Sequence, residues 1–350
     1  MSLKKNKAVN ILETEIAPGQ SADIQVPISR LLGDSPVNMP VTVVNGKFAG
    51  PTLMITAAIH GDELNGIEII RRVLTSSWIQ KLRGTLIAIP IVNVLGTVHR
   101  SRYLPDRRDL NRCFPGSSKG SLGARVANLI TQEFLPHVEY AIDLHTGAIH
   151  RSNLPQIRVH LENERAANMA NAFGAPVIID AEIRDGSLRG AGDDLGIAII
   201  TYEAGEALRF EESAITPGVR GVRNVMTHLG MLPVRKTKSK GNDAVLAQSS
   251  SWVRAPIDGF FRPHVALGDR VRKGDVLAYM SGPLENEGTP VVTPANGLVI
   301  GRNNLPQALE GEALFHIARF DKVREAEKAV EQFHTEIDVQ IEESNWPIAD

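Results

Sequence analysis

Short β-branched runs alternate with segments of helical periodicity between about residue 40 and residue 233, and this alternation constrains the fold most. Strands and helices that alternate along a chain pack as α/β layers, because the helices cover the sheet that the strands form. Most runs are too apolar for one face to meet water, so we expect strands covered on both faces. The expected strands span residues 41–44, 52–59, 85–92, 140–144, 156–161, 176–179 and 196–202, and the expected helices span residues 64–74, 122–134, 162–173 and 216–229.

An Asn-Gly pair at residues 45–46 separates the first two expected strands. Asn-Gly favours the tight turn of a β-hairpin. We therefore expect these two strands to pair with each other as an antiparallel edge of the sheet.

The character of the chain changes after Met231. Residues 233–244 are polar and basic, which is typical of a linker. Beyond them, a Pro-x-x-Gly frame at residues 256–259 recurs at residues 294–297, and this weak repeat predicts a small, pseudo-symmetric all-β sandwich. The sandwich resembles biotinyl/lipoyl domains in shape, but its central hairpin, GPLENEGTP, has no lysine, so we expect no attached cofactor. We predict an α/β domain over residues 1–240, the β-sandwich over 241–320 and a C-terminal helix and tail over 321–350.

Charge and cysteine content narrow the class of partner and the compartment. With 38 Lys and Arg against 40 Asp and Glu, the net charge of -2 argues against nucleic acid or an anionic membrane as the main partner, which leaves small molecules. A single cysteine, Cys113, excludes an internal disulfide framework and favours a reducing compartment. No apolar stretch of about 18 residues or of signal-peptide length occurs, so we expect a cytoplasmic protein. A symmetric homo-oligomer is compatible with an appended β-rich domain.

His60 and Glu63 follow the apolar run 51–59 at the point where a strand gives way to a helix. Their spacing allows both side chains to turn toward one point above the sheet, and imidazole with carboxylate suits Zn²⁺. The alternative is a carboxylate that stabilises the helix N-terminus beside an incidental histidine. Taken alone, this pair does not decide between the two.

Two further strand ends carry candidate residues. His145 follows the run 140–144, and Asp143 lies on the same strand face, where it is a candidate acceptor for the imidazole N–H. Glu203 lies at the end of the run 196–202, close enough to that edge to act as a base, whereas we expect Glu206 in solvent. Open α/β sheets build sites from such strand ends. The alternatives are an Asp143 that serves nearby backbone and a Glu203 that ends its strand in solvent.

The segment SRYLPDRRDLNRCFPG at residues 101–116 holds four arginines, Arg102, Arg107, Arg108 and Arg112, interrupted by two prolines. It is a poor helix and a good anion-binding loop, because guanidinium groups pair with carboxylates in forked geometry. The alternative is a surface loop with incidental arginines.

Four motifs in this order, HGDE at 60–63, RDLNRCFPG at 108–116, DLHTG at 143–147 and YEAGE at 202–206, resemble the succinylglutamate desuccinylase/aspartoacylase family of the zinc carboxypeptidase superfamily. The resemblance covers roughly residues 40–235, and the β-rich C-terminal region is similar to the one these deacylases carry. It implies a zinc-carboxypeptidase-like mixed sheet flanked by helices, within a hydrolytic domain.

The resemblance also implies roles for individual residues. It makes His60, Glu63 and His145 the ligands of one zinc ion per chain, and Glu203 the general base that activates zinc-bound water. Asn111 and Arg112 match the pair that holds the substrate carboxylate, with Arg108 as a further substrate-binding candidate. Arg102 is expected to polarise the scissile carbonyl, although Arg100, Arg107 or Arg108 could take this role. The implied reaction is amide hydrolysis in a small N-acyl amino acid or related carboxylate.

Two other functions stay open at this point. A metallo-carboxypeptidase that cleaves peptides uses the same residues, and a non-catalytic zinc-binding scaffold would keep the ligands. Glu203 argues against the scaffold, because a structural zinc is closed by a fourth Cys, His or Asp ligand. Outside the motifs, we expect His316 to be a satisfied framework residue and Trp252 to offer no stacking platform.

Overall fold

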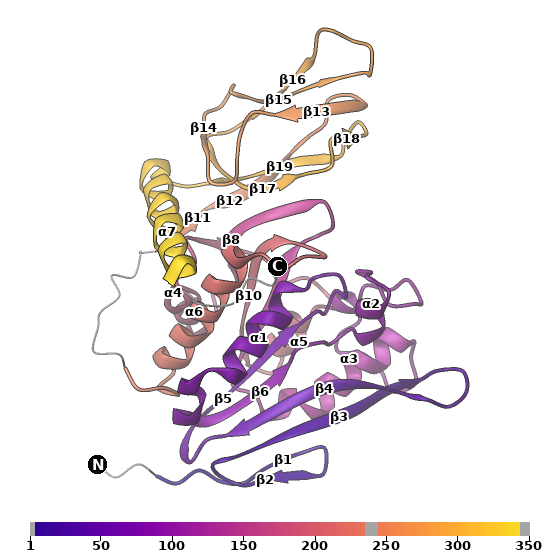
Figure 1. The fold of residues 1–350 in the computed structure, drawn as a ribbon, viewed down its shortest axis with the longest axis vertical. Coiled ribbons are helices and arrows are strands. Elements are labelled where there is room, and N and C mark those ends of the chain that lie inside the picture. Colours follow the sequence, from indigo (N-terminus) through magenta and orange to yellow (C-terminus); the bar gives the residue numbers. More distant parts are fainter. Residues whose placement is uncertain (1–3, 235–243, 344–350) are drawn as a thin grey trace.

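The computed structural model describes residues 4–234 and 244–343, so most of the predicted linker lies outside the described residues. A mixed sheet of thirteen strands runs through the molecule (Figure 1). Its main path has the order β12-β19-β17-β8-β10-β7-β5-β6-β4-β3, and β9, β11 and β14 pair at its side. In the α/β part the strands are β3 (Gln20–Arg30), β4 (Pro36–Asn45), β5 (Phe48–Ala57), β6 (Arg83–Ile89), β7 (Tyr140–Gly147), β8 (Arg151–Val159), β9 (Val177–Asp180) and β10 (Ala198–Glu206).

Helices cover both faces of this sheet, as the apolar strands predict. Helices α1 (Asn65–Thr75), α4 (Glu164–Phe173) and α6 (Glu212–His228) share one hydrophobic core with the sheet, and α3 (Leu122–Glu133) and α5 (Leu188–Asp193) share the core on the other face. Along β5 the side chains of Leu53 and Ile55 enter the first core and that of Met54 enters the second. This alternation is the two-residue period of a strand, and it lets one strand hold both layers together.

The predicted hairpin at residues 45–46 is wrong. Strand β4 pairs antiparallel with β3 on one side and with β6 on the other, and β5 runs parallel to β6 and β7. Asn45 and Gly46 both lack the positive φ that a type I′ turn requires. Asn45 is instead buried and donates its side-chain amide to the carbonyls of Lys7 and Ile16. A Cβ at Gly46 would lie 2.3 Å from the Leu82 carbonyl oxygen, so this glycine serves a close backbone approach.

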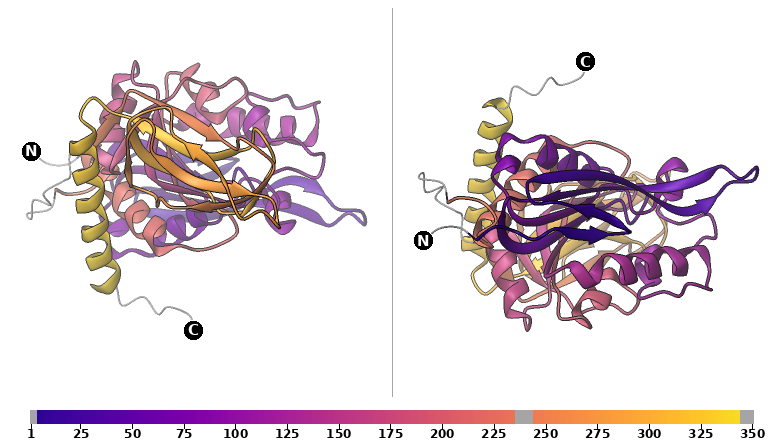
Figure 2. Two further views of the ribbon diagram at one scale, coloured as in Figure 1. Left: turned by 90° about the horizontal axis from the view of Figure 1, so that it is seen from above. Right: turned by 90° about the horizontal axis from the view of Figure 1, so that it is seen from below.

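The N-terminal part of the chain extends the sheet beyond the predicted start near residue 40. Strand β3 forms a long antiparallel pair with β4, and β1 (Val9–Ile11) and β2 (Thr14–Ile16) form a small sheet of their own. These strands lie at one end of the molecule and the C-terminal strands at the other (Figure 2). Four short elements complete the described α/β part: α2 (Val94–Val98), and 3-10 turns at Ser77–Lys81, Leu110–Arg112 and Leu135–His137.

The predicted all-β region is present after residue 244. Strands β13, β15, β16 and β18 form a separate four-stranded sheet, which packs on β12, β17 and β19 around a shared core. The bounds are β11 (Val245–Ala247), β12 (Ser249–Arg254), β13 (Gly259–Pro263), β14 (Arg270–Val271), β15 (Val276–Ser281), β16 (Thr289–Val292), β17 (Gly297–Asn303), β18 (Gln307–Ala308) and β19 (Ala313–Arg319).

Hydrogen bonding does not stop at the predicted boundary at residue 240. Strand β17 pairs antiparallel with β8, and β11 pairs parallel with β9, so the all-β region and the α/β part share one sheet. The C-terminal helix α7 (Val323–Glu343) packs near α6 and closes this side of the molecule (Figure 1). Within the described residues, no helix combines the length and apolar character needed to span a bilayer.

Candidate metal centre and substrate cavity

The predicted ligands come together at the ends of two adjacent parallel strands. Strands β5 and β7 pair in register up to Ala57 and Leu144, so the chain leaves β5 toward His60 and Glu63 beside the point where β7 carries His145. One ligand atom from each of the three side chains lies within 4.8 Å of the others. All three are buried, with exposed fractions of 4%, 2% and 5% for His60, Glu63 and His145. This donor set, two imidazoles and one carboxylate, fits a zinc ion.

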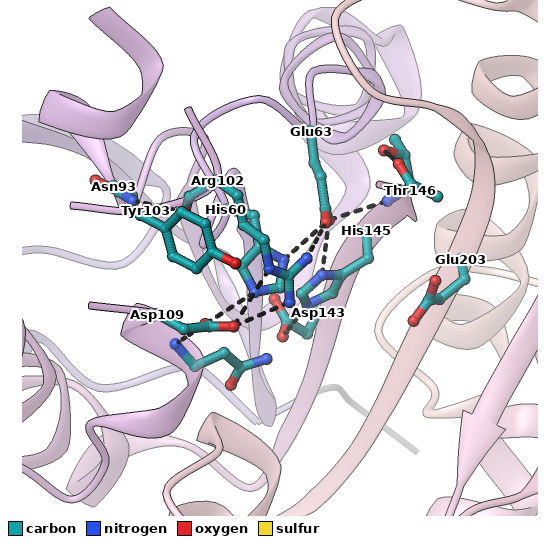
Figure 3. Close-up of polar contacts among 12 residues, drawn as sticks. His60, Glu63, Asn93, Arg102, Tyr103, Asp109, Asp143, His145, Thr146 and Glu203 are labelled. Carbon is teal, nitrogen blue, oxygen red and sulfur yellow. Dashed lines mark hydrogen bonds and ion pairs between the residues drawn. The ribbon is translucent and has the colours of Figure 1, made fainter. Parts of the chain in front are cut away.

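The hydrogen bonds around the histidines select which ring nitrogen faces the centre. Nδ1 of His60 and Nδ1 of His145 lie 2.7 Å and 2.8 Å from the carboxylate oxygens of Glu63 (Figure 3). Nε2 of His60 lies 3.1 Å from Asp109, and Nε2 of His145 lies 2.7 Å from Asp143. A carboxylate at Nε2 holds a proton there, which leaves the Nδ1 lone pair for a metal. Asp143 therefore lies where the sequence predicted an acceptor for the imidazole.

Asp109 was missed by the sequence analysis, although it lies inside the arginine-rich loop. Its carboxylate contacts His60 and also accepts from Nη2 of Arg102 at 3.0 Å. Nothing in the spacing of residues 101–116 indicated that this loop would reach back to the β5 exit. Only folding places the loop there.

The field at the centre favours positive charge. Burial would raise the pKa of the Glu63 carboxyl, but His60 and His145 outweigh it and lower that pKa. Burial would lower the pKa of His145, but Asp143 and Glu63 raise it well above its usual value. Both shifts express the pairing of buried carboxylates with imidazoles. The carboxylates that favour positive charge on the imidazoles here would equally favour a bound divalent cation.

The four arginines that were candidates to polarise the carbonyl differ in their positions in the structure. Arg102 lines the cavity above the centre, and its Nη1 lies 3.3 Å from Glu63. Arg100, Arg107 and Arg108 are exposed and are not among the described residues that line this cavity. Arg108 has its nearest ion-pair partner, at 3.7 Å, in Asp106. Its predicted contact with the substrate therefore has no geometric support here, because its side chain faces solvent.

Asn111 and Arg112, for which we predicted a role in carboxylate binding, both line the cavity. The Asn111 side-chain oxygen accepts a hydrogen bond of 2.9 Å from the backbone N–H of Leu188. This contact ties the loop to the start of α5 and fixes the direction in which Asn111 presents its NH₂ group.

Glu203 lies on β10, directly beside His145 in the register of the parallel pair β7/β10. Figure 3 shows its carboxylate pointing toward the side where His145 lies. Its oxygens are held from strand β8: the Asn153 amide donates at 2.8 Å, and Nε of Arg158 lies at 3.2 Å. Glu206, which we expected in solvent, is 3% exposed and accepts from the backbone N–H of His150.

The cavity that contains these groups has a volume of about 540 Å³. Beyond the predicted residues it is lined by further arginines of the α/β part and by two residues of the all-β region, Ser250 and Trp252. Sequence reasoning missed these residues because they are scattered over distant segments and share no motif. The additional arginines are Arg151, Arg158, Arg184 and Arg189.

Comparison with known proteins identifies relatives of this chain. The model of the succinylglutamate desuccinylase/aspartoacylase catalytic domain matches residues 49–229. An N-alpha-acetyl-L-2,4-diaminobutyric acid deacetylase from Halomonas elongata is 31% identical over 257 residues, covering 69% of this chain and 73% of that protein.

Solved structures agree with this assignment. A succinylglutamate desuccinylase/aspartoacylase from Rhodobacter sphaeroides is 25% identical with a TM-score of 0.76, covering 86% of this chain and 95% of that one. The product-bound ectoine utilization protein EutE (DoeB) from Ruegeria pomeroyi is 25% identical with a TM-score of 0.78, covering 90% and 100%. The chain therefore belongs to the succinylglutamate desuccinylase/aspartoacylase family.

Proposed function

We propose that the protein is a zinc-dependent deacylase that hydrolyses the amide bond of a small N-acyl amino acid or a related carboxylate. The observation that carries this proposal is one cavity in which His60, Glu63 and His145 face Glu203 and an arginine-lined wall. Among the described residues the cluster has three ligand side chains, as in catalytic zinc sites that keep a position for water or substrate. A cytoplasmic location and a symmetric oligomer stay predictions from the sequence.

His60 and His145, through Nδ1, and the Glu63 carboxylate would hold the zinc ion. When bound, zinc acts as a Lewis acid and lowers the pKa of water toward about 7, which makes a strong nucleophile at neutral pH. Asp109 and Asp143 orient the two imidazoles for this task through their hydrogen bonds at Nε2.

The chain's own side chains supply the proton transfers and the stabilisation of charge. A carboxylate oxygen of Glu203 takes a proton from the attacking water and later delivers it to the leaving amine. Arg102, beside Glu63 at 3.3 Å, is placed to stabilise negative charge on the carbonyl oxygen. Asn111 and Arg112 hold a substrate carboxylate, so that the amide is oriented above the centre.

The electrostatics of the cavity wall support an anionic substrate. Burial, together with the like charges of Arg112 and Arg158, lowers the pKa of Arg184, and burial with Arg158 and Arg184 lowers that of Arg189. These arginines repel one another, and a substrate carboxylate between them would relieve the repulsion. We therefore propose that N-acyl amino acids with a second carboxylate in the side chain are preferred over one with a cationic side chain, such as the substrate in the relative's name.

The test is an amine-release assay with purified, zinc-loaded protein. The panel holds N-acetyl and N-succinyl forms of acidic, neutral and basic amino acids, Nα-acetyl-diaminobutyrate and short peptides. We expect hydrolysis of N-acyl amino acids, fastest for acidic ones. Faster cleavage of peptides would establish the carboxypeptidase instead, and bound zinc without any hydrolysis would establish the scaffold.

Glu203→Gln tests the proposed mechanism within that assay. The substitution keeps the size of the side chain and removes its basicity, so zinc content should be unchanged while kcat falls by about 10²- to 10⁴-fold. Full activity in this variant would exclude Glu203 as the base.

A further inference from the structure

The all-β region meets the α/β part directly beside Glu203. Strand β17 pairs with β8 over three residues, and Gly301 of β17 lies opposite Asn153 of β8. On its other side, Asn153 lies opposite Gly205 of β10, the strand that carries Glu203. Asn153 of β8 therefore has β17 of the all-β region on one side and β10, the strand of Glu203, on the other.

The side chain of Asn153 is buried and hydrogen-bonds Glu203. It is 8% exposed, and its Nδ2 donates a hydrogen bond of 2.8 Å to Oε2 of Glu203. Arg158 approaches the other oxygen at 3.2 Å, but within the described residues its Nε makes no hydrogen bond, so this contact supplies charge and little direction. In the described part of the chain, Asn153 is the side chain that hydrogen-bonds this carboxylate.

The all-β region shapes the space in which Asn153 lies. Gly301 pairs with His316 of β19, and His316 pairs with Trp252 of β12, so a row of residues runs across four strands from Asn153 to Trp252. The His316 and Trp252 rings stack with centroids 4.6 Å apart and planes 7° apart. Trp252, which we expected to offer no stacking platform, thus packs its ring on a framework histidine.

Gly301 leaves the gap that this row requires. A Cβ at this position would lie 3.1 Å from Oδ1 of Asn153, 3.1 Å from Cβ of His316 and 3.6 Å from the ring of Trp252. A larger residue would push the Asn153 amide or the stacked rings out of place. Because Gly301 has no side chain, the stacked rings of His316 and Trp252 can pack close to the Asn153 side chain.

We propose that Asn153 is a positioning residue for Glu203, and that Gly301 with the stacked His316–Trp252 pair makes the all-β region the support of this contact. The inference rests on the proposed role of Glu203 as general base. A base must point at the proton it removes, and a misplacement of about 1 Å can cost about 10²-fold in rate. The appended region then acts on catalysis itself, in addition to forming part of the cavity wall.

The test is a double-mutant cycle of Asn153→Ala and Glu203→Gln, with kcat and KM measured at equal zinc content. Asn153→Ala is expected to lower kcat by about 10- to 100-fold with KM changed less than about 3-fold. In the Glu203→Gln background the same substitution should change kcat by less than about 2-fold, since the base is already removed. Asn153→Asp keeps the size but cannot donate, so it should lose kcat as well, and it serves if the alanine variant does not fold.

Gly301→Ala probes the support from the all-β region. It should lower kcat by about 3- to 10-fold without raising KM, and it should add little to Asn153→Ala. Two matched controls should leave kcat unchanged: Gly282→Ala, whose Cβ meets only the end of the Glu285 side chain, and Asn224→Ala, which loses a hydrogen bond to the Phe173 carbonyl.

The outcomes separate the two proposals. If Asn153→Ala raises KM and leaves kcat intact, Asn153 is a substrate contact and the inference is wrong. Fully additive losses of kcat in the double mutant would also overturn it, because they would show a general structural effect. If Glu203→Gln alone stays active, the proposed role of the base fails first, whatever Asn153 does.

Discussion

Two regions line the same cavity, and they contribute to it in different ways. The α/β part supplies His60, His145 and Glu203 from the ends of three adjacent strands, each within a short polar motif that follows an apolar run. The all-β region supplies Trp252, with His316 behind it, from strands that carry no recognisable motif. In this molecule the strand ends place the reactive groups, whereas the lateral pairing of strands decides what surrounds them.

The largest expected effect tests the α/β side of this comparison. His145→Ala removes a proposed zinc ligand and should abolish stoichiometric zinc binding. Activity should fall on the order of 10³-fold or more, because a metal contributes several kcal/mol to charge stabilisation in the transition state. Zinc analysis and the amine-release assay check both, and a variant that keeps its zinc would remove His145 from the ligand set.

The two carboxylates behind the histidines should have smaller effects. Asp109→Asn and Asp143→Asn each weaken the hydrogen bond that orients an imidazole, and zinc affinity should fall by about 10- to 100-fold. Competition with a chelator measures this. The control is Asp23→Asn on the distant strand β3, which accepts a hydrogen bond from Thr42 and should leave affinity unchanged.

On the all-β side, Trp252→Ala should change substrate binding. Loss of the aromatic wall should raise KM by about 2- to 10-fold while zinc content stays constant, and Trp252→Phe should restore most of the loss because it keeps a stacked ring. Steady-state kinetics on the best substrate decide. An unchanged KM in both variants would mean that substrate does not reach this wall.

A still smaller effect is expected on the free energy of unfolding at acidic pH, and it arises from His316. Burial, and then the charge of Arg158, lowers the pKa of His316 to about 3. The unfolded chain binds a proton at this histidine below about pH 6.5 while the folded protein does not, so the free energy of unfolding falls as pH drops from 6.5 toward 3.

The native protein should therefore lose about 2 kcal/mol more than His316→Phe between pH 7.5 and pH 5. Denaturant unfolding of both proteins at the two pH values measures the difference. Equal losses would show that His316 does not titrate in this way.

The sequence-based predictions were right where the signal is local and wrong where the feature depends on tertiary contacts. The helices near α1, α3, α4 and α6 and the strand exits at His60 and His145 were predictable, because hydrophobic periodicity and its abrupt end are local signals. The predicted hairpin at Asn45 was wrong, because a strand pairs with the strands that the whole fold brings beside it, and here β6 lies next to β4. His316 was expected to have its hydrogen bonds satisfied, yet its Nδ1 is buried and has no hydrogen-bond partner among the described residues, a property that only its neighbours determine.

Local spacing along the chain is enough to predict the α/β class, the all-β region and the residue types that can hold a metal. The tertiary structure decided which nitrogen of His60 and His145 faces the centre, which loop arginine reaches it, and that Asn153 holds Glu203 beside strands from the other end of the chain. The physical reason is that ring orientation, charge pairing and strand register depend on contacts between residues up to about 150 positions apart, and such contacts leave no periodic pattern in the chain.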